Sequence, residues 1–123
     1  MTPKRFLFGG GIALIILGVT GLFGILGQLS DLAFFHPPHW INWVHFLLGL
    51  TIFSVSFTRY EKFQGWLVVF PAIIATTMGV VGLLFGSHLA QRFDIPELAD
   101  PSDHSAHLVV GLLAMWAWRN RTK

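Results

Sequence analysis

A ten-residue segment occurs twice in this sequence, and the repetition limits the folds that the chain can adopt. Residues 41–50 and 103–112 both contain a polar residue, two spacers, a histidine, three apolar residues and a glycine. The two histidines, His45 and His107, lie 62 residues apart. Self-similarity at a fixed period indicates a fold that is built from repeated units.

A second pair of segments repeats with nearly the same offset. Residues 18–24 and 79–86 are both rich in glycine, and they are shifted by 61 residues. The two pairs together predict a hairpin of about 60 residues that is written twice. Repeat 1 covers about residues 1–60 and repeat 2 about residues 61–123 of one domain.

The composition places this repeat in a membrane. Hydrophobic residues make up 54% of the chain and charged residues only 11%, whereas soluble domains carry about 25% charged residues. A chain this apolar is expected to be an integral membrane protein in contact with the lipid bilayer. The net charge of +2 does not indicate nucleic-acid binding, because the basic residues form short clusters at the ends of apolar runs.

The apolar runs predict four transmembrane helices. We expect them over residues 6–27, 38–58, 63–86 and 101–118, since each is close to the length that crosses a hydrocarbon core of about 30 Å. Polar loops over 28–37 and 87–100 and a tight turn near 59–62 connect them. Asp100 followed by Pro101 is a helix-start signal for the last helix.

The distribution of positive charge predicts the orientation. All but one of the eight Lys and Arg residues flank the termini or the central turn, and the exception is Arg92. Positive residues favour the cytoplasmic side, so both termini are expected there. Because each repeat then contains two spans, the repeats enter the membrane the same way up and are parallel. The predicted location is a bacterial inner membrane or a thylakoid membrane, with multiple passes.

Small residues mark the predicted contacts between helices. Such residues let helix backbones approach closely in a membrane. In the third predicted helix they are spaced four, three and four residues apart, which places them on one face. The candidate packing residues are Gly18, Gly21, Ala75, Gly79, Gly82 and Gly86.

Histidines carry the only pattern that points to chemistry. All six lie on the extracytoplasmic side of the predicted topology: His36, His39, His45, His88, His104 and His107. His45 and His107 occupy equivalent positions just inside the second and fourth helices. Asn42 and His104 precede them by three residues, on the same helical face. We consider three roles for the pair: hydrogen bonding between helices, binding of a metal or tetrapyrrole, and proton relay.

The segment Asn42-x-x-His45-x-x-x-Gly49, together with His107-Leu108, resembles a family of small bacterial four-helix membrane proteins known only as a domain of unknown function. The resemblance spans nearly the whole chain and implies the four-helix fold, but it implies no activity. The family has an acid three residues before the helix-four histidine. This chain has His104 at that position and an acid only at Asp103.

Three functions compete. The leading prediction is a small non-catalytic membrane protein, a structural or accessory subunit that packs against a larger membrane complex or associates with itself. The alternative is a haem- or chlorophyll-binding accessory protein of an electron-transfer or photosynthetic complex that uses His45 and His107. The third is a small transporter, against which the lack of charged residues at the centre of the bilayer argues. We expect no enzyme, because we find no nucleophile–base pair and no nucleotide motif; Gly9-Gly10-Gly11 is interpreted as a packing feature.

Overall fold

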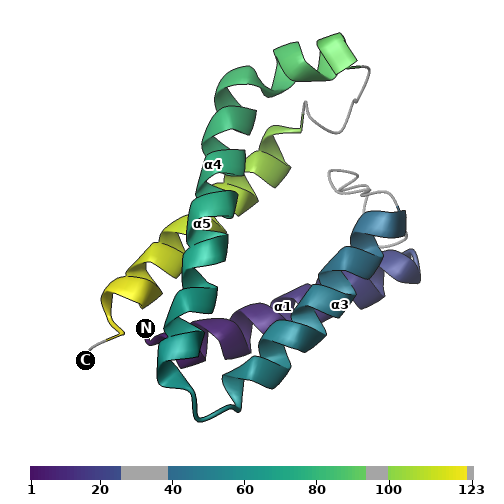
Figure 1. The fold of residues 1–123 in the computed structure, drawn as a ribbon. Coiled ribbons are helices and arrows are strands. Elements are labelled where there is room, and N and C mark those ends of the chain that lie inside the picture. The colour runs from purple at the N-terminus through teal and green to yellow at the C-terminus, as the bar shows by residue number, and fades with distance from the viewer. Residues whose placement is uncertain (26–38, 94–99, 122–123) are drawn as a thin grey trace.

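The computed structural model of the chain describes residues 1–25, 39–93 and 100–121, and every regular element in them is an α-helix. The helices are α1 (Pro3–Leu22), α3 (His39–Ser56), α4 (Glu61–Phe93) and α5 (Pro101–Arg119). Figure 1 shows them as two hairpins in chain order. The predicted all-helical class is therefore confirmed, with four long helices in the described residues.

Two helices begin with the same cap. The Thr2 side chain accepts a hydrogen bond from the Arg5 amide at 3.4 Å, and the Asp100 carboxylate accepts one from the Ser102 amide at 2.8 Å. In both cases a proline occupies the first turn. The first N–H groups of a helix have no acceptor within the helix, so a proline there costs no hydrogen bond. These caps explain why α1 begins earlier than residue 6, and why α5 begins where Asp100 predicts.

The first helix is shorter at its C-terminus than predicted. α1 ends at Leu22, and Gly24 adopts φ 65°. A glycine in this left-handed conformation is a common way to end a helix, because it has no Cβ to clash. The predicted continuation to residue 27 is therefore wrong at residues 23–24, and the predicted loop before α3 lies outside the described residues.

The third predicted helix is longer than expected. α4 continues to Phe93, so the prediction of a loop from residue 87 is wrong for residues 87–93. This segment contains no proline or glycine, and its Leu89, Ala90, Gln91 and Arg92 are good helix formers. Their polarity suggested a loop, but polarity does not break a helix.

Each hairpin is held together along its whole length. α1 packs against α3 and α4 packs against α5, whereas contacts between the hairpins involve mainly α1. Figure 1 shows that the N-terminus, the C-terminus and the turn between α3 and α4 lie at the end where the hairpins meet. We call this the closed end. At the opposite, open end the hairpins diverge.

Equivalent glycines allow the close packing within each hairpin. A Cβ added at Gly18 in α1 would lie 2.6 Å from the Phe46 amide nitrogen in α3, and one added at Gly79 in α4 would lie 2.6 Å from the Leu108 amide nitrogen in α5. These distances are far below van der Waals contact, so the backbones touch because no side chain separates them. The two hairpins thus make matching contacts at the offsets seen in the sequence.

The reverse contacts also match. A Cβ at Gly49 in α3 would lie 2.7 Å from the Ile15 nitrogen, and one at Gly111 in α5 would lie 2.6 Å from the Thr76 nitrogen. Each seam is therefore lined by glycines from both of its helices. Of the other residues predicted to pack in α4, Ala75 and Gly86 are both buried.

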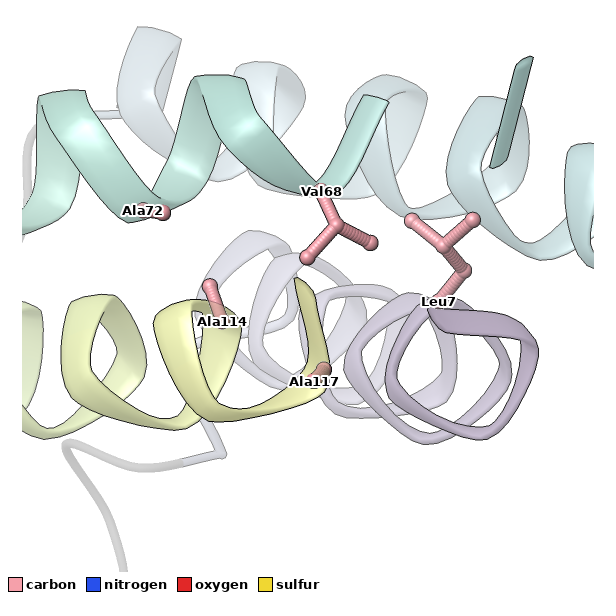
Figure 2. Close-up of a cluster of buried hydrophobic side chains, with 5 residues drawn as sticks. All are labelled: Leu7, Val68, Ala72, Ala114 and Ala117. Carbon is pink, nitrogen blue, oxygen red and sulfur yellow. The ribbon is translucent and has the colours of Figure 1, made fainter. Parts of the chain in front are cut away.

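The two hairpins share a small core at the closed end. It consists of one leucine, one valine and three alanines: Leu7 from α1, Val68 and Ala72 from α4, and Ala114 and Ala117 from α5. Figure 2 shows Leu7 and Val68 directed toward one another, with the alanines lining the space between α4 and α5. These small side chains let the three helices approach closely there.

Gln64 fixes the turn between the hairpins. Its side chain is 2% exposed, and its amide nitrogen lies 3.2, 3.3 and 2.9 Å from the carbonyl oxygens of Val55, Ser56 and Thr58, respectively. The last carbonyls of a helix have no partner within the helix. Gln64 supplies one from the next helix, and so ties the end of α3 to the start of α4.

Two helices are long and apolar enough to cross a membrane, namely α1 and α4. The apolar part of α3, Trp40–Ser56, is shorter than that test requires. The two spans that pass are the first helices of the two hairpins, so they occupy equivalent positions in the repeat.

Candidate functional site

Asn42 and His104 lie inside the two hairpin seams. Both side chains are buried, with 3% and 7% of their surfaces exposed. The Asn42 side chain packs directly over Gly21 in α1, and the His104 ring packs directly over Gly82 in α4. The two polar residues therefore occupy equivalent places, each in the space left by a missing glycine side chain.

This placement explains why the glycines and the polar residues occur together. A methyl group at Gly21 would overlap the Asn42 amide, and one at Gly82 would overlap the His104 ring. Asn42 and His104 therefore belong to the packing of their own hairpins.

His107 is oriented by Asp103, one turn earlier on α5. Its Nδ1 lies 2.8 Å from the Asp103 backbone carbonyl oxygen and 3.4 Å from the Asp103 carboxylate. Both oxygens accept, so Nδ1 carries the proton and Nε2 is the remaining acceptor of a neutral ring. The side chains are 28% and 31% exposed. The sequence contains this signal as an acid four residues before a histidine.

His45 is partly buried on α3 and has a different environment. Its Nδ1 is buried and has no hydrogen-bond partner among the described residues. An imidazole nitrogen in apolar surroundings loses several kcal/mol without a partner, on the order of 2–7. The Thr76 hydroxyl on α4 is likewise buried without a hydrogen-bond partner among the described residues.

His45 and His107 come from different hairpins and lie within electrostatic reach of one another. The Asp103 carboxylate also acts on His45, His104 and His107. The structure thus gathers these four titratable groups at the open end. No group of three or more His, Cys, Asp or Glu among the described residues is arranged to hold a metal ion.

The remaining three histidines are His36, His39 and His88. His36 lies outside the described residues, and His39 is the first residue of α3. His88, which the sequence predicted in a loop, is instead an exposed residue of α4. The acids Asp94 and Glu97, which belong to the predicted loop over 87–100, lie outside the described residues.

The arrangement can support two kinds of chemistry. An imidazole whose Nδ1–H is held by a carboxylate or carbonyl presents Nε2 as a ligand, and histidines that bind metals or haem usually donate their other N–H in this way. The same imidazole can form a hydrogen bond between two hairpins. Comparisons with family models, with curated proteins and with solved structures find no match to this chain.

Proposed function

We propose that the chain is a non-catalytic membrane protein with four spans, and that it serves as a structural or accessory subunit packed against a larger membrane complex. The supporting observation is where the large apolar side chains lie. They cover the outside of all four helices, whereas the core shared by the hairpins contains only one leucine, one valine and three alanines.

The lengths of the helices are consistent with four spans. α1 and α4 satisfy the requirement on length and apolarity alone. α3 and α5 have 18 and 19 residues, within the range of about 17–25 that crosses a bilayer. Since each of these packs along a spanning helix, the seams carry them through the same depth of membrane.

The closed end is the cytoplasmic end in this proposal. It gathers Lys4 and Arg5, the Arg59–Lys62 turn and the basic C-terminus. Arg92, the exception, belongs to the last turn of α4 at the open end. Positive residues near the ends of spans favour the cytoplasm. Both termini are therefore cytoplasmic and the cluster around His45 and His107 faces the other side.

The open end favours a partner over an isolated chain. The hairpins diverge there, and the buried Nδ1 of His45 has no partner among the described residues. Lipid chains can cover apolar surface, but they cannot satisfy an imidazole. A second membrane protein packed against the exposed apolar side chains would cover surface that the small shared core leaves open.

Site-specific photocrosslinking in native membranes tests this proposal. A photoreactive benzoylphenylalanine replaces one exposed apolar residue on each helix, namely Ile16, Leu47, Leu84 or Leu112, with buried Leu7 as the matched control. We expect at least one helix to give a single protein adduct of defined mass, and Leu7 to give none outside the chain. If all four exposed positions react only with lipid, the accessory role is wrong.

A specific observation also favours the tetrapyrrole alternative. His107 has the Nδ1–H orientation of a ligating histidine, and His45 on the other hairpin has a buried nitrogen without a partner. A haem or chlorophyll between the hairpins would use these two residues as ligands.

The absorption spectrum of the purified protein decides between these proposals. A bound tetrapyrrole gives a visible band that is lost in both His45→Phe and His107→Phe. A colourless protein whose stability falls in both variants supports a hydrogen-bonding role. The exposed His88→Phe on α4 is the control that should change neither property.

A further inference from the structure

A small cleft at the closed end lies between the start of α1 and the end of α3. It has a volume of about 280 Å³ and is lined by Thr2, Lys4, Arg5, Phe8, Ser56 and Phe57. Its lining thus combines two cations with two aromatic rings. Neither the hairpin seams nor the histidine cluster uses these residues.

Neither cation at this cleft forms an ion pair with a described residue. Lys4 and Arg5 are exposed, and the first turn of α1 contains no acid. In the part of the chain that the structure describes, the only close contact between a basic and an acidic side chain joins His107 to Asp103 at the opposite end. The cleft therefore presents two positive charges without a counterion among the described residues.

The aromatic side of the cleft is held in place by ring contacts. The Phe8 ring centroid lies 5.4 Å from that of Phe53 and 5.9 Å from that of Phe57, and Phe53 and Phe57 are 5.0 Å apart. Such pairs stabilise one another beyond simple burial. Phe8 and Phe57 nevertheless remain 43% and 62% exposed, so the trio offers an ordered apolar surface beside the cations.

The neighbouring end of α3 does not oppose an anion strongly. A helix C-terminus carries a partial negative charge on its last carbonyl groups. Here the carbonyls of Val55, Ser56 and Thr58 lie within hydrogen-bonding distance of the Gln64 amide. The Ser56 hydroxyl is likewise directed to the Phe53 carbonyl. The polar character of the cleft is therefore set mainly by Lys4 and Arg5.

We infer that this cleft binds an anionic phospholipid of the cytoplasmic leaflet. The phosphate lies between Lys4 and Arg5, and the upper part of an acyl chain lies against Phe8 and Phe57. Basic residues at the cytoplasmic surface attract anionic headgroups, and the adjoining rings select a ligand with an apolar tail. The inference rests on the proposed orientation in the membrane, because only that orientation brings the cleft to this leaflet.

The test measures lipid retained by the full-length protein in nanodiscs of phosphatidylcholine with one-fifth phosphatidylglycerol, by native mass spectrometry after release into mild detergent. The Lys4→Gln/Arg5→Gln variant should retain at least tenfold less phosphatidylglycerol than the wild type. The matched control, Arg119→Gln/Arg121→Gln, removes the same charge at the same end outside the cleft and should change retention less than twofold. Equal losses in the two variants would overturn the proposal, since binding would then depend on net charge alone.

Two further measurements are needed. The first distinguishes a lipid headgroup from free phosphate, and the second distinguishes failure of the cleft proposal from failure of the membrane proposal. Phe57→Ala should weaken retention of phosphatidylglycerol but leave binding of inorganic phosphate unchanged; if neither changes, the site recognises phosphate alone and the lipid assignment is wrong. Resistance of the protein to extraction from membranes by alkaline carbonate is measured in parallel. A protein that resists extraction but retains no phosphatidylglycerol refutes only the cleft, whereas an extractable protein refutes the membrane proposal.

Discussion

The sharpest prediction concerns two adjacent glycines in α1. A Cβ added at Gly11 would lie 2.7 Å from the Phe53 amide nitrogen and 2.9 Å from its Cα, whereas one added at Gly10 meets nothing within 4 Å. Alanine at Gly11 should therefore push α1 away from α3. Alanine at Gly10 makes the same chemical change one residue away without a clash.

The size of the effect follows from these distances. Contact between carbon atoms is most favourable at about 3.5–4.0 Å, so α1 and α3 must separate by roughly 1 Å to accept the methyl group. Overpacking of this kind costs about 1–3 kcal/mol. Alanine also favours a helix over glycine by about 1 kcal/mol, but this gain is common to both variants. The difference between them therefore isolates the steric cost.

Reversible unfolding in mixed micelles, followed by tryptophan fluorescence while the fraction of denaturing detergent rises, measures this difference. We expect Gly11→Ala to unfold with a free energy about 1–3 kcal/mol lower than that of Gly10→Ala. A difference below about 0.5 kcal/mol, which is the usual range for substitutions away from special features, would refute the close backbone contact at Phe53.

Three further predictions use the same purified protein. Gln64→Ala should lower the free energy of unfolding by about 1–3 kcal/mol because buried carbonyls lose their donor, whereas Gln91→Ala, at an exposed position of the same helix, should change it little. Asp100→Ala should cost about 0.5–2 kcal/mol and speed hydrogen exchange at the Ser102 amide; unchanged exchange would argue against the cap. The sequence has no cysteine, so single cysteines introduced at Ser102 and Tyr60 report the membrane topology directly. An impermeant maleimide should label the cysteine at position 102 from outside intact cells, and the cysteine at position 60 only after lysis. Labelling of both from one side would contradict the proposed orientation.

The helices could be predicted because their signals are local. Asp100 and Pro101 identify the start of α5 from their own chemistry, and Thr2 and Pro3 form the same signal at α1. That second pair precedes the apolar run from residue 6 on which the prediction of the first helix was based. The end of α4 was misplaced for a related reason: residues 87–93 are polar, and polarity was given more weight than helix propensity.

The contacts between helices could be predicted only in part. The repeat relates Gly18 to Gly79 and His45 to His107, and the packing stripe in α4 was visible from its spacing. The sequence could not tell which of Gly9, Gly10 and Gly11 faces a neighbour, because successive residues differ by about 100° around a helix. Only the position of α3 identifies Gly11.

The contact of His107 with Asp103 and the capping of α3 by Gln64 were missed for different reasons. Asp103 and His107 are four residues apart, a spacing that places them on one face, so the sequence contained a usable signal. Gln64 acts across a turn on carbonyls up to nine residues away. Its role depends on how tightly the turn closes, and no local pattern reports that geometry.

The separation of the chain into two seams and one small shared core has a consequence for synthesis. Gly18 and Phe46 are about 28 residues apart in the chain, whereas Leu7 and Ala117 are about 110 residues apart. Ribosomes add roughly 5–20 residues per second, so the first hairpin can close seconds before α5 exists. Docking of the halves can begin on Val68 and Ala72 of α4, but the shared core is complete only when the last residues of the chain supply Ala114 and Ala117. A pause in translation before Ala114 should therefore leave a closed first hairpin whose Leu7 still lacks its neighbours from α5.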